Sequence, residues 1–136
     1  MEGFYLAFGD GLSEEANRIA QALAGLLLKA PPEGLWEAVP AYGTLYLEYD
    51  ARRLSRKRLL GLVSRLATTL AERGEESRLV EIPVRYDGED LLEVARRTGL
   101  PLEEVKRLHR APLYRVYALG FTPGFPFLAP VEPALR

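Results

Sequence analysis

The sequence predicts an α+β protein that completes one small domain and then begins a second domain that it does not finish. Up to residue 82, two segments with apolar residues at helical spacing alternate with short runs typical of β-strands. After Pro83 the pattern changes to short helices and a loop dense in glycine, proline and phenylalanine. We therefore predict one domain at 1–82 and the start of another at 83–136.

The first domain follows the order β-α-β-β-α-β. Each predicted helix carries one apolar stripe, and the strand Thr44–Tyr49 alternates in polarity. This order is the split βαβ, or ferredoxin-like, arrangement, in which two helices cover one face of a four-stranded antiparallel sheet. The predicted strands are Phe4–Phe8, Leu35–Val39, Thr44–Tyr49 and Arg78–Arg85, and the helices run from the caps Ser13 and Ser55 to Pro31 and Gly74.

The second domain is predicted to open with two short helices and a strand. Gly99 ends the helix Leu91–Thr98, and Pro101 introduces the helix Leu102–Arg110. Tyr114–Leu119 alternates as a strand and leads into the loop Gly120–Leu128.

Composition excludes several classes of function. The 136 residues carry a formal net charge of −1, so no global field attracts nucleic acid or anionic lipid. The absence of cysteine excludes thiolate chemistry, and one histidine leaves no histidine-rich metal centre, so no metal is predicted. The N-terminus does not resemble a signal peptide, and the apolar stretch Ile19–Leu28 is too short to span a bilayer. We expect a cytoplasmic protein without membrane or nucleic-acid partners.

The segment GFTPGFPFL, residues 120–128, is the most informative one. Its glycines and prolines fix the backbone and allow it to approach a ligand closely. Its three phenylalanines are costly to expose, so they should pack on a core, a ligand or a partner. From composition alone, a rigid loop that plugs the end of a sheet is favoured over a binding site.

Other candidate residues also have ordinary structural explanations. Histidine is the side chain whose ordinary pKa lies closest to neutral pH, so His109, the single histidine, is the natural candidate for a general acid or base, although a lone histidine near a helix end more often has a structural role. The acidic cluster Asp87, Glu89 and Asp90 is typical of a turn followed by helix-capping carboxylates. The cationic run Arg52–Arg58 fits a solvated helix face better than a site for phosphate or an acidic protein.

Two nucleotide-related patterns are weak. Gly9-Asp10-Gly11 lacks the spaced glycines and the Lys-Ser/Thr of a phosphate loop, so this chain alone should not hydrolyse ATP. ARRTGLPLEEVKRLHR imitates a helix-turn-helix with cations on its second helix, but the neutral net charge and the missing third helix count against DNA binding.

Longer motifs resemble a known family over essentially the whole chain. They are GDGLSEEANRIAQAL, VPAYGTLYLEYD, EIPVRYDGEDLLEVARRTGLPLEEVKRLH and YRVYALGFTPGFPFL. The sequence is similar to the amino-terminal part of the B component of the bacterial ATP-dependent 5-oxoprolinase, a family also called KipI or the first component of allophanate hydrolase. The helix-turn-helix interpretation is then set aside, because its segment matches the helices that enter the family's second domain.

The resemblance implies a small α+β domain followed by a cyclophilin-like β-barrel, related to the carboxyltransferase-like part of urea carboxylases. It implies an enzyme component that works with a homologous, KipA-like C component and with the A component to open 5-oxo-L-proline to glutamate, with ATP used by the whole complex. An alternative role is inhibition of a sensor histidine kinase, which Arg52–Arg58 would suit. The family's further barrel strands do not follow Arg136, so we expect a fragment that is inactive alone.

The resemblance also assigns candidate residues. His109 matches the histidine of the family's EEV…LH motif and becomes a candidate proton carrier. Tyr114 and Tyr117 lie on the strand that leads to the family's GF-PGF loop beside the substrate pocket. Backbone N–H groups around the two loop glycines are expected to bind the developing oxyanion of a lactam. The loop residues that match are Gly120, Phe121, Pro123, Gly124, Phe125 and Phe127.

Overall fold

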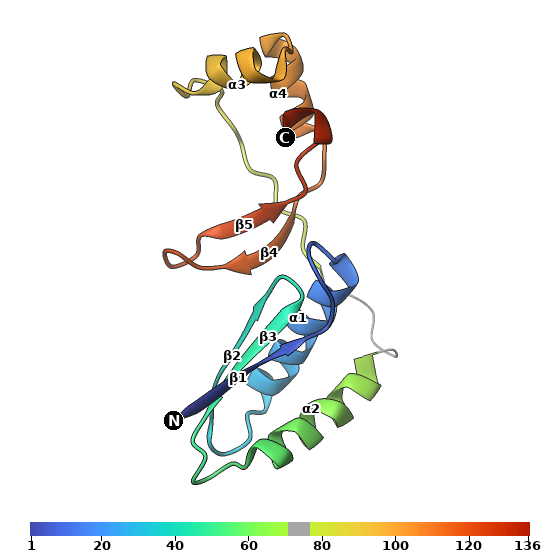
Figure 1. The fold of residues 1–136 in the computed structure, drawn as a ribbon, viewed down its shortest axis with the longest axis vertical. Helices are drawn as coiled ribbons and strands as arrows, with labels where there is room; N and C mark the ends of the chain where they lie inside the picture. Colours follow the sequence, from blue (N-terminus) through green and yellow to red (C-terminus); the bar gives the residue numbers. More distant parts are fainter. Residues whose placement is uncertain (71–76) are drawn as a thin grey trace. The chain divides into compact units, whose positions relative to one another are not determined.

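A computed structural model describes residues 1–70 and 77–136 of the chain (Figure 1). It divides into unit 1, Met1–Glu76 with Tyr117–Phe127, and unit 2, Ser77–Val116 with Leu128–Arg136. The predicted domain boundary after residue 82 stays a prediction. The elements in chain order are β1 (Glu2–Ala7), α1 (Glu14–Lys29), β2 (Leu35–Ala41), β3 (Thr44–Tyr49), α2 (Arg56–Leu70), α3 (Leu91–Thr98), α4 (Leu102–Arg110), β4 (Arg115–Leu119), β5 (Pro126–Ala129) and the 3₁₀ turn η1 (Pro133–Leu135).

Unit 1 is built on an antiparallel sheet with the strand order β1-β3-β2. Leu47 on the central strand lies opposite Phe4 of β1 and Ala38 of β2, and all three are buried. Helices α1 and α2 cover this face of the sheet (Figure 1). The core therefore lies between the sheet and the two helices, and its members are Phe4, Ala20, Leu23, Ala24, Leu27, Ala38, Leu45, Leu47, Tyr49, Leu54, Leu59 and Val63.

The two helices of unit 1 begin where the sequence predicts. The Oγ of Ser13 accepts a hydrogen bond from the Ala16 N–H at 3.2 Å, which satisfies one of the unpaired donors of the first turn of α1. The Oγ of Ser55 accepts from the Arg58 N–H at 3.3 Å at the start of α2. The predicted end of this helix at Gly74 lies outside the described residues.

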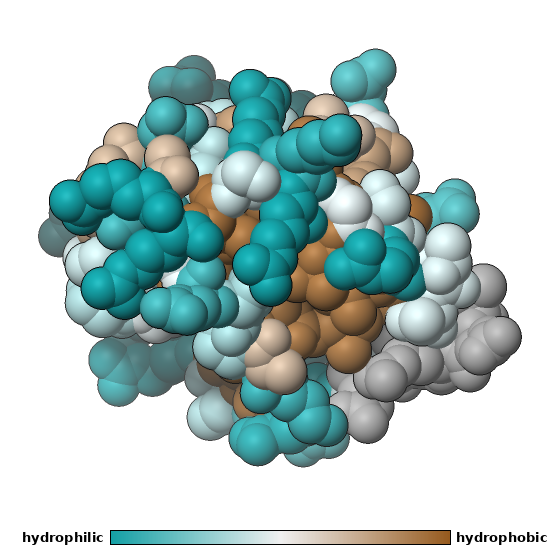
Figure 2. Space-filling model, turned by 90° about the horizontal axis from the view of Figure 1, so that it is seen from below, coloured by the Kyte–Doolittle hydropathy of each residue, from teal (hydrophilic) through white to brown (hydrophobic). Residues whose placement is uncertain are grey.

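The core reaches the surface along α2. Its half-buried side chains pack against the buried cluster and leave one edge in contact with solvent. Figure 2, a view from below, shows hydrophobic surface between long hydrophilic side chains at the end of unit 1 where α2 lies. The half-buried leucines of α2 are Leu60, Leu62, Leu66 and Leu70.

The predicted fourth strand of the first domain is wrong. Residues Arg78–Arg85 belong to no strand of the structure, and the large apolar side chains among them are exposed. Alternating apolar residues favour an extended backbone, but a strand also needs a partner for its N–H and C=O groups, and Pro83 has no N–H. The described sheet of unit 1 has three strands, so the ferredoxin-like arrangement is not confirmed.

The remaining elements largely follow the sequence. Helices α3 and α4 match the predicted ranges, and Gly99 ends α3 in the left-handed conformation with φ 68°. The predicted strand Tyr114–Leu119 is present as β4. Residues 126–128, the end of the predicted loop Gly120–Leu128, instead belong to β5, which pairs with β4. A two-stranded sheet is not a barrel, so the cyclophilin-like part of the prediction is not confirmed. Among residues 1–70 and 77–136, no helix combines the length and apolar character needed to cross a membrane.

Two backbone segments meet closely at one end of the sheet. The Phe8 N–H, after β1, donates to the Gly43 carbonyl in the β2–β3 turn at 2.8 Å. A Cβ atom at Gly43 would lie 2.6 Å from the carbonyl oxygen of Gly9 and 3.2 Å from the Cβ of Ala16. Because backbone cannot give way as a side chain does, this contact requires glycine at position 43.

We therefore predict that Gly43→Ala lowers the free energy of unfolding by about 1–3 kcal/mol. Gly25→Ala is the matched control, because a Cβ at this exposed position of α1 meets no atom within 4 Å. The control should be stabilising by about 0.5–1 kcal/mol through better helix propensity. Urea denaturation of both variants checks this; equal midpoints for Gly43→Ala and the wild type would contradict the close approach.

Asp50 organises the connection from β3 to α2. Its carboxylate accepts from the backbone N–H of Arg52 at 3.0 Å and from the Arg52 guanidinium at 3.1 Å. Its carbonyl accepts from the N–H groups of Arg53 and Leu54. The side-chain hydrogen bond from Arg52, followed by the backbone one, lowers the pKa of Asp50 from its usual 3.8 to about 2.

Because the pKa of Asp50 is lower in the folded than in the unfolded chain, its contribution to stability is present above about pH 4 and is lost as the pH falls toward about 2. We predict that the thermal midpoint of the wild type falls more steeply across this window than that of Asp50→Asn. Asp10→Asn, at an exposed loop position, should keep the wild-type slope. Parallel curves for the wild type and Asp50→Asn would contradict the assignment.

Candidate functional site

The tip of the β4–β5 hairpin holds most of the predicted site residues, and its backbone is closed by its own hydrogen bonds. The Thr122 N–H donates to the Gly120 carbonyl at 2.8 Å, and the Phe125 N–H donates to the Thr122 carbonyl at 3.0 Å. The Gly120 N–H donates to the Phe125 carbonyl at 3.1 Å, so it is already used within the hairpin. This group is therefore not available to an oxyanion, contrary to the expectation from the sequence.

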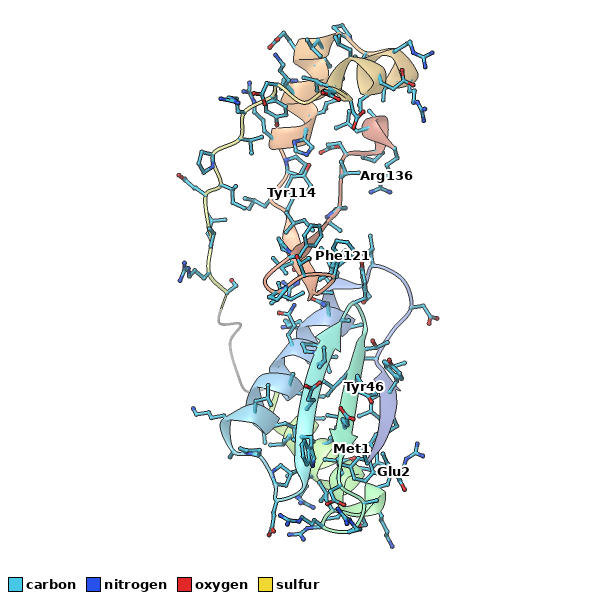
Figure 3. The ribbon with its side chains drawn as sticks, turned by 90° about the vertical axis from the view of Figure 1, so that its left-hand side faces the viewer. Met1, Glu2, Tyr46, Tyr114, Phe121 and Arg136 are labelled. Carbon is cyan, nitrogen blue, oxygen red and sulfur yellow. The ribbon has the colours of Figure 1, made fainter. Side chains whose placement is uncertain are left out.

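The three phenylalanines of the tip form a ladder of rings. The centroids of Phe121 and Phe125 are 5.9 Å apart and those of Phe125 and Phe127 are 5.3 Å apart, and both pairs meet edge to face. Phe121 is nevertheless 90% exposed and adopts φ 66°, which is uncommon for a residue with a large side chain (Figure 3). The tip is not a plug buried in a core, which was the interpretation that composition favoured.

A buried asparagine anchors the strand that leads to this tip. Asn17 of α1 is fully buried, and its Nδ2 donates to the Tyr42 carbonyl at 2.8 Å and to the Tyr117 carbonyl at 3.0 Å. Its Oδ1 accepts from the Gln21 side chain at 2.9 Å. The Tyr42 N–H donates to the same Tyr117 carbonyl at 2.8 Å. One side chain therefore joins α1, the β2–β3 turn and β4.

The tyrosines at this junction are also packed. Tyr117, a predicted site residue, is 4% exposed, so its side chain serves the interior of unit 1. Its ring stacks on Tyr42 with centroids 6.2 Å apart and planes 22° apart. Tyr42 has φ 52°, a conformation that costs energy and persists only where neighbouring groups enforce it, as Asn17 and Tyr117 do here.

Asn17 is a residue that the sequence interpretation missed. Positions 17, 20 and 24 share one face of α1, and Ala20 and Ala24 are buried beside it. A polar residue on the apolar face of a helix is the signal that could have found it, since buried polar groups need partners.

His109 lies on the last turn of α4 in unit 2, whereas the hairpin tip belongs to unit 1. Its Nδ1 is 2.9 Å from the hydroxyl of Tyr86, and its ring also neighbours that of Tyr114 at 5.9 Å. The Tyr114 hydroxyl donates to the His109 carbonyl at 2.5 Å. Burial, followed by the proximity of Tyr86 and Glu132, raises the pKa of Tyr114. Tyr86 orients the imidazole, and the sequence analysis did not single it out.

Several charged residues considered from the sequence are paired locally. On α4, Lys106 pairs with Glu103 at 2.8 Å and Arg107 with Glu104 at 2.6 Å. Two of the cations that resembled those of a helix-turn-helix are therefore paired with carboxylates of the same helix. In the acidic cluster, Asp87 pairs with Arg85 at 2.5 Å. Among residues 1–70 and 77–136, no three histidine, aspartate or glutamate side chains gather in a way that could hold a metal ion.

The cationic run is also partly neutralised. Arg52 pairs with Asp50 at 3.1 Å, and Arg53 lies 3.5 Å from Glu33. The guanidinium carbon of Arg56 lies 4.7 Å from the centre of the Phe4 ring, a cation–π contact.

An open hollow of about 450 Å³ lies in unit 1 beside Tyr42. The turn after β1 and the turn between β2 and β3 form its walls, and Asp10 is its one carboxylate. Its lining residues are Ala7, Gly9, Asp10, Gly11, Leu12, Tyr42, Gly43 and Thr44.

Comparison with known proteins decides the family. Residues 1–136 match the family model described as carboxyltransferase domain, subdomain C and D. The chain belongs to this family. The B component of the 5-oxoprolinase of Bacillus subtilis strain 168 is 37% identical over 137 residues, which cover 90% of this chain and 57% of that protein. The corresponding 5-oxoprolinase component of Escherichia coli O157:H7 is 46% identical over 64 residues, which cover 45% of this chain and 29% of that protein.

The resemblance to the B component of 5-oxoprolinase is thereby confirmed, and the chain spans little more than half the length of the Bacillus subtilis relative. Solved structures agree. The crystal structure of TTHA0988 in space group P212121 superposes with a TM-score of 0.92 at 73% identity, covering 99% of this chain and 27% of that one. The urea carboxylase of Kluyveromyces lactis has a TM-score of 0.58 at 12% identity, covering 87% and 13%, which shows a shared fold.

We predict that removing the donors of Asn17 destabilises unit 1. Asn17→Ala leaves the Tyr42 and Tyr117 carbonyls without this partner and should cost about 2 kcal/mol of unfolding free energy. Asn17→Asp should cost more, because a carboxylate oxygen then faces two carbonyl oxygens. Gln21→Ala, which removes the donor to Oδ1 and leaves both carbonyls paired with Nδ2, should cost less than either. Denaturation curves measure all three; an aspartate variant as stable as the wild type would contradict the role of the amide.

Proposed function

We propose that this chain is part of a 5-oxoprolinase B component that works with the A and C components to open 5-oxo-L-proline to glutamate at the expense of ATP. One observation carries the proposal: the curated relatives that match this chain are named as this component of 5-oxoprolinase. The hairpin tip of this chain supports it, because Phe121 is the most exposed aromatic side chain of the described residues and the turn that carries it is closed by its own hydrogen bonds. The cytoplasm is the proposed setting.

The hairpin tip suits a small planar ring. A lactam has apolar faces and a polar amide edge, so phenylalanine rings can pack on its faces while other groups hold the carbonyl. Ring opening adds water across the amide bond, with hydroxyl on the carbonyl carbon and hydrogen on the nitrogen. Charge develops on the carbonyl oxygen, and donors for it must come from groups other than the Gly120 N–H.

His109 remains a proposed proton carrier. Its Nδ1 faces the Tyr86 hydroxyl, so a transferred proton would pass through Nε2. The tyrosine then fixes the ring orientation, as a partner on the other nitrogen commonly does.

Further polypeptide is part of the proposal. A two-stranded sheet is marginally stable by itself, and the segment around Pro83 exposes large apolar side chains. Both features support a cyclophilin-like barrel that further polypeptide of a longer protein completes. The Bacillus subtilis relative is such a longer chain, because the match covers 57% of its length. The exposed residues are Leu79, Val80, Ile82 and Val84.

Kinase inhibition is not proposed. It would use the cationic run Arg52–Arg58, but Arg52 is already paired with Asp50 and Arg53 with Glu33 within this chain.

The test uses the complete B component reconstituted with the A and C components, with glutamate formation and ATP hydrolysis followed together. Phe121→Ala should lower kcat/KM for 5-oxoproline about tenfold, as loss of a hydrophobic contact with substrate does. Its thermal midpoint should stay unchanged, because the side chain is 90% exposed. Leu113→Ala, at an exposed position in unit 2, is the control and should retain full activity.

No 5-oxoproline-dependent turnover by the wild-type complex would refute the function. Full activity of Phe121→Ala would instead remove the hairpin tip from the site. His109→Ala in the same assay tests the proposed proton carrier. The variant should lower turnover, and unchanged turnover would exclude the imidazole from proton transfer.

A further inference from the structure

The sheet of unit 1 has a second face, turned away from its core. Strand register places alternate residues there, so that Tyr46 of β3 lies between Tyr5 of β1 and Val39 of β2 (Figure 3). The next row places Glu48 between Gly3 and Glu37. We call this the outer sheet face, and it consists of Gly3, Tyr5, Ala7, Glu37, Val39, Ala41, Thr44, Tyr46 and Glu48.

Aromatic rings dominate the middle of the outer sheet face. The rings of Tyr5 and Tyr46 have centroids 4.9 Å apart, and Tyr5 is 71% exposed. Tyr46 occupies the space above Gly3 where a Cβ would stand. Trp36, the one tryptophan of the sequence, is 63% exposed at the bulge just before Glu37.

Two carboxylates lie directly opposite each other on this face. Glu37 and Glu48 are cross-strand partners, and like charges in this position destabilise a sheet. Neither forms an ion pair with any residue in the described part of the chain. Burial, followed by the negative charge of Glu48, raises the pKa of Tyr46.

Other glutamates of this chain form ion pairs with nearby cations, in contrast to Glu37 and Glu48. Glu93, Glu103 and Glu104 each lie within 2.8 Å of an arginine or lysine three residues further along a helix. The outer sheet face keeps two adjacent negative charges beside exposed aromatic rings, and both features attract cations.

We propose that the outer sheet face docks a lysine- or arginine-rich segment of a partner protein, with cationic side chains between the Glu37–Glu48 pair and the rings of Tyr5 and Tyr46. Charge complementarity selects this occupant. A second copy would have to present its cationic run Arg52–Arg58, in which Arg52 already pairs with Asp50 and Arg53 with Glu33, so a partner that brings other cations is favoured. The proposal is independent of the hairpin tip and of 5-oxoprolinase activity.

The test titrates the chain with a short lysine- and arginine-rich peptide and follows Trp36 fluorescence and calorimetric heat. The double variant Glu37→Gln, Glu48→Gln should bind about fivefold more weakly, the size expected for two exposed ion pairs. A control double variant, Glu14→Gln with Glu15→Gln, makes the same change of net charge on α1, which packs on the opposite face of the sheet, and should bind as the wild type does. A peptide with glutamine in place of its cations should not bind.

Stability supplies a second readout. Without peptide, the Glu37→Gln, Glu48→Gln variant should melt at a higher temperature than the wild type, because the repulsion is gone. Weaker binding can then not be ascribed to unfolding. Absence of binding, or equal weakening in both double variants, would overturn the proposal. Self-association that the same variant abolishes would also overturn it and make a second copy the occupant.

Discussion

The buried amide of Asn17 satisfies two main-chain carbonyls that meet inside unit 1. A buried carbonyl without a donor is costly, and the Nδ2 group has two hydrogens, one for Tyr42 and one for Tyr117. An apolar side chain of similar size would fill the same space and leave both oxygens without this donor. The part of β4 that leads into the aromatic hairpin is therefore held within unit 1 by the chemistry of this side chain, in addition to apolar packing.

Other features of unit 1 depend on this junction. The left-handed backbone of Tyr42 is held on both sides, by the amide at its carbonyl and by Tyr117 at its N–H. The close backbone approach at Gly43 brings the same turn against the end of β1. The junction fixes the base of the hairpin, and the hydrogen bonds within the tip fix the turn that leaves Phe121 exposed to solvent. A rigid, exposed aromatic group is a reasonable element of a ligand site, since little entropy is lost when it binds.

Local patterns were sufficient for most of the elements. The apolar stripes and caps located α1 and α2, and glycine and proline located α3 and α4. Pairing was not predictable in the same way: Arg78–Arg85 alternates well yet has no partner strand among the described residues, whereas Pro126–Ala129 has the composition of a loop yet pairs with β4. A β-strand forms only when a neighbouring strand pairs with it, and a single sequence does not show which segment supplies that partner.

The candidate site shows the same division. Residue types identified the aromatic hairpin, but whether its rings are buried depends on tertiary packing. Asn17 lies a hundred residues from Tyr117, so no local pattern connects them. Tyr86 was likewise hidden, because its contact with His109 arises only when the chain before α3 returns to the end of α4.

Amide hydrogen exchange at Tyr42 tests the role of this junction most directly. Its N–H belongs to a turn, where exchange is normally fast, but here it donates to the Tyr117 carbonyl at 2.8 Å. We expect this amide to exchange about a hundredfold more slowly than that of Gly11 in the exposed turn after β1. Equal rates at the two positions would show that β4 is not held by this junction and would contradict the central role of Asn17.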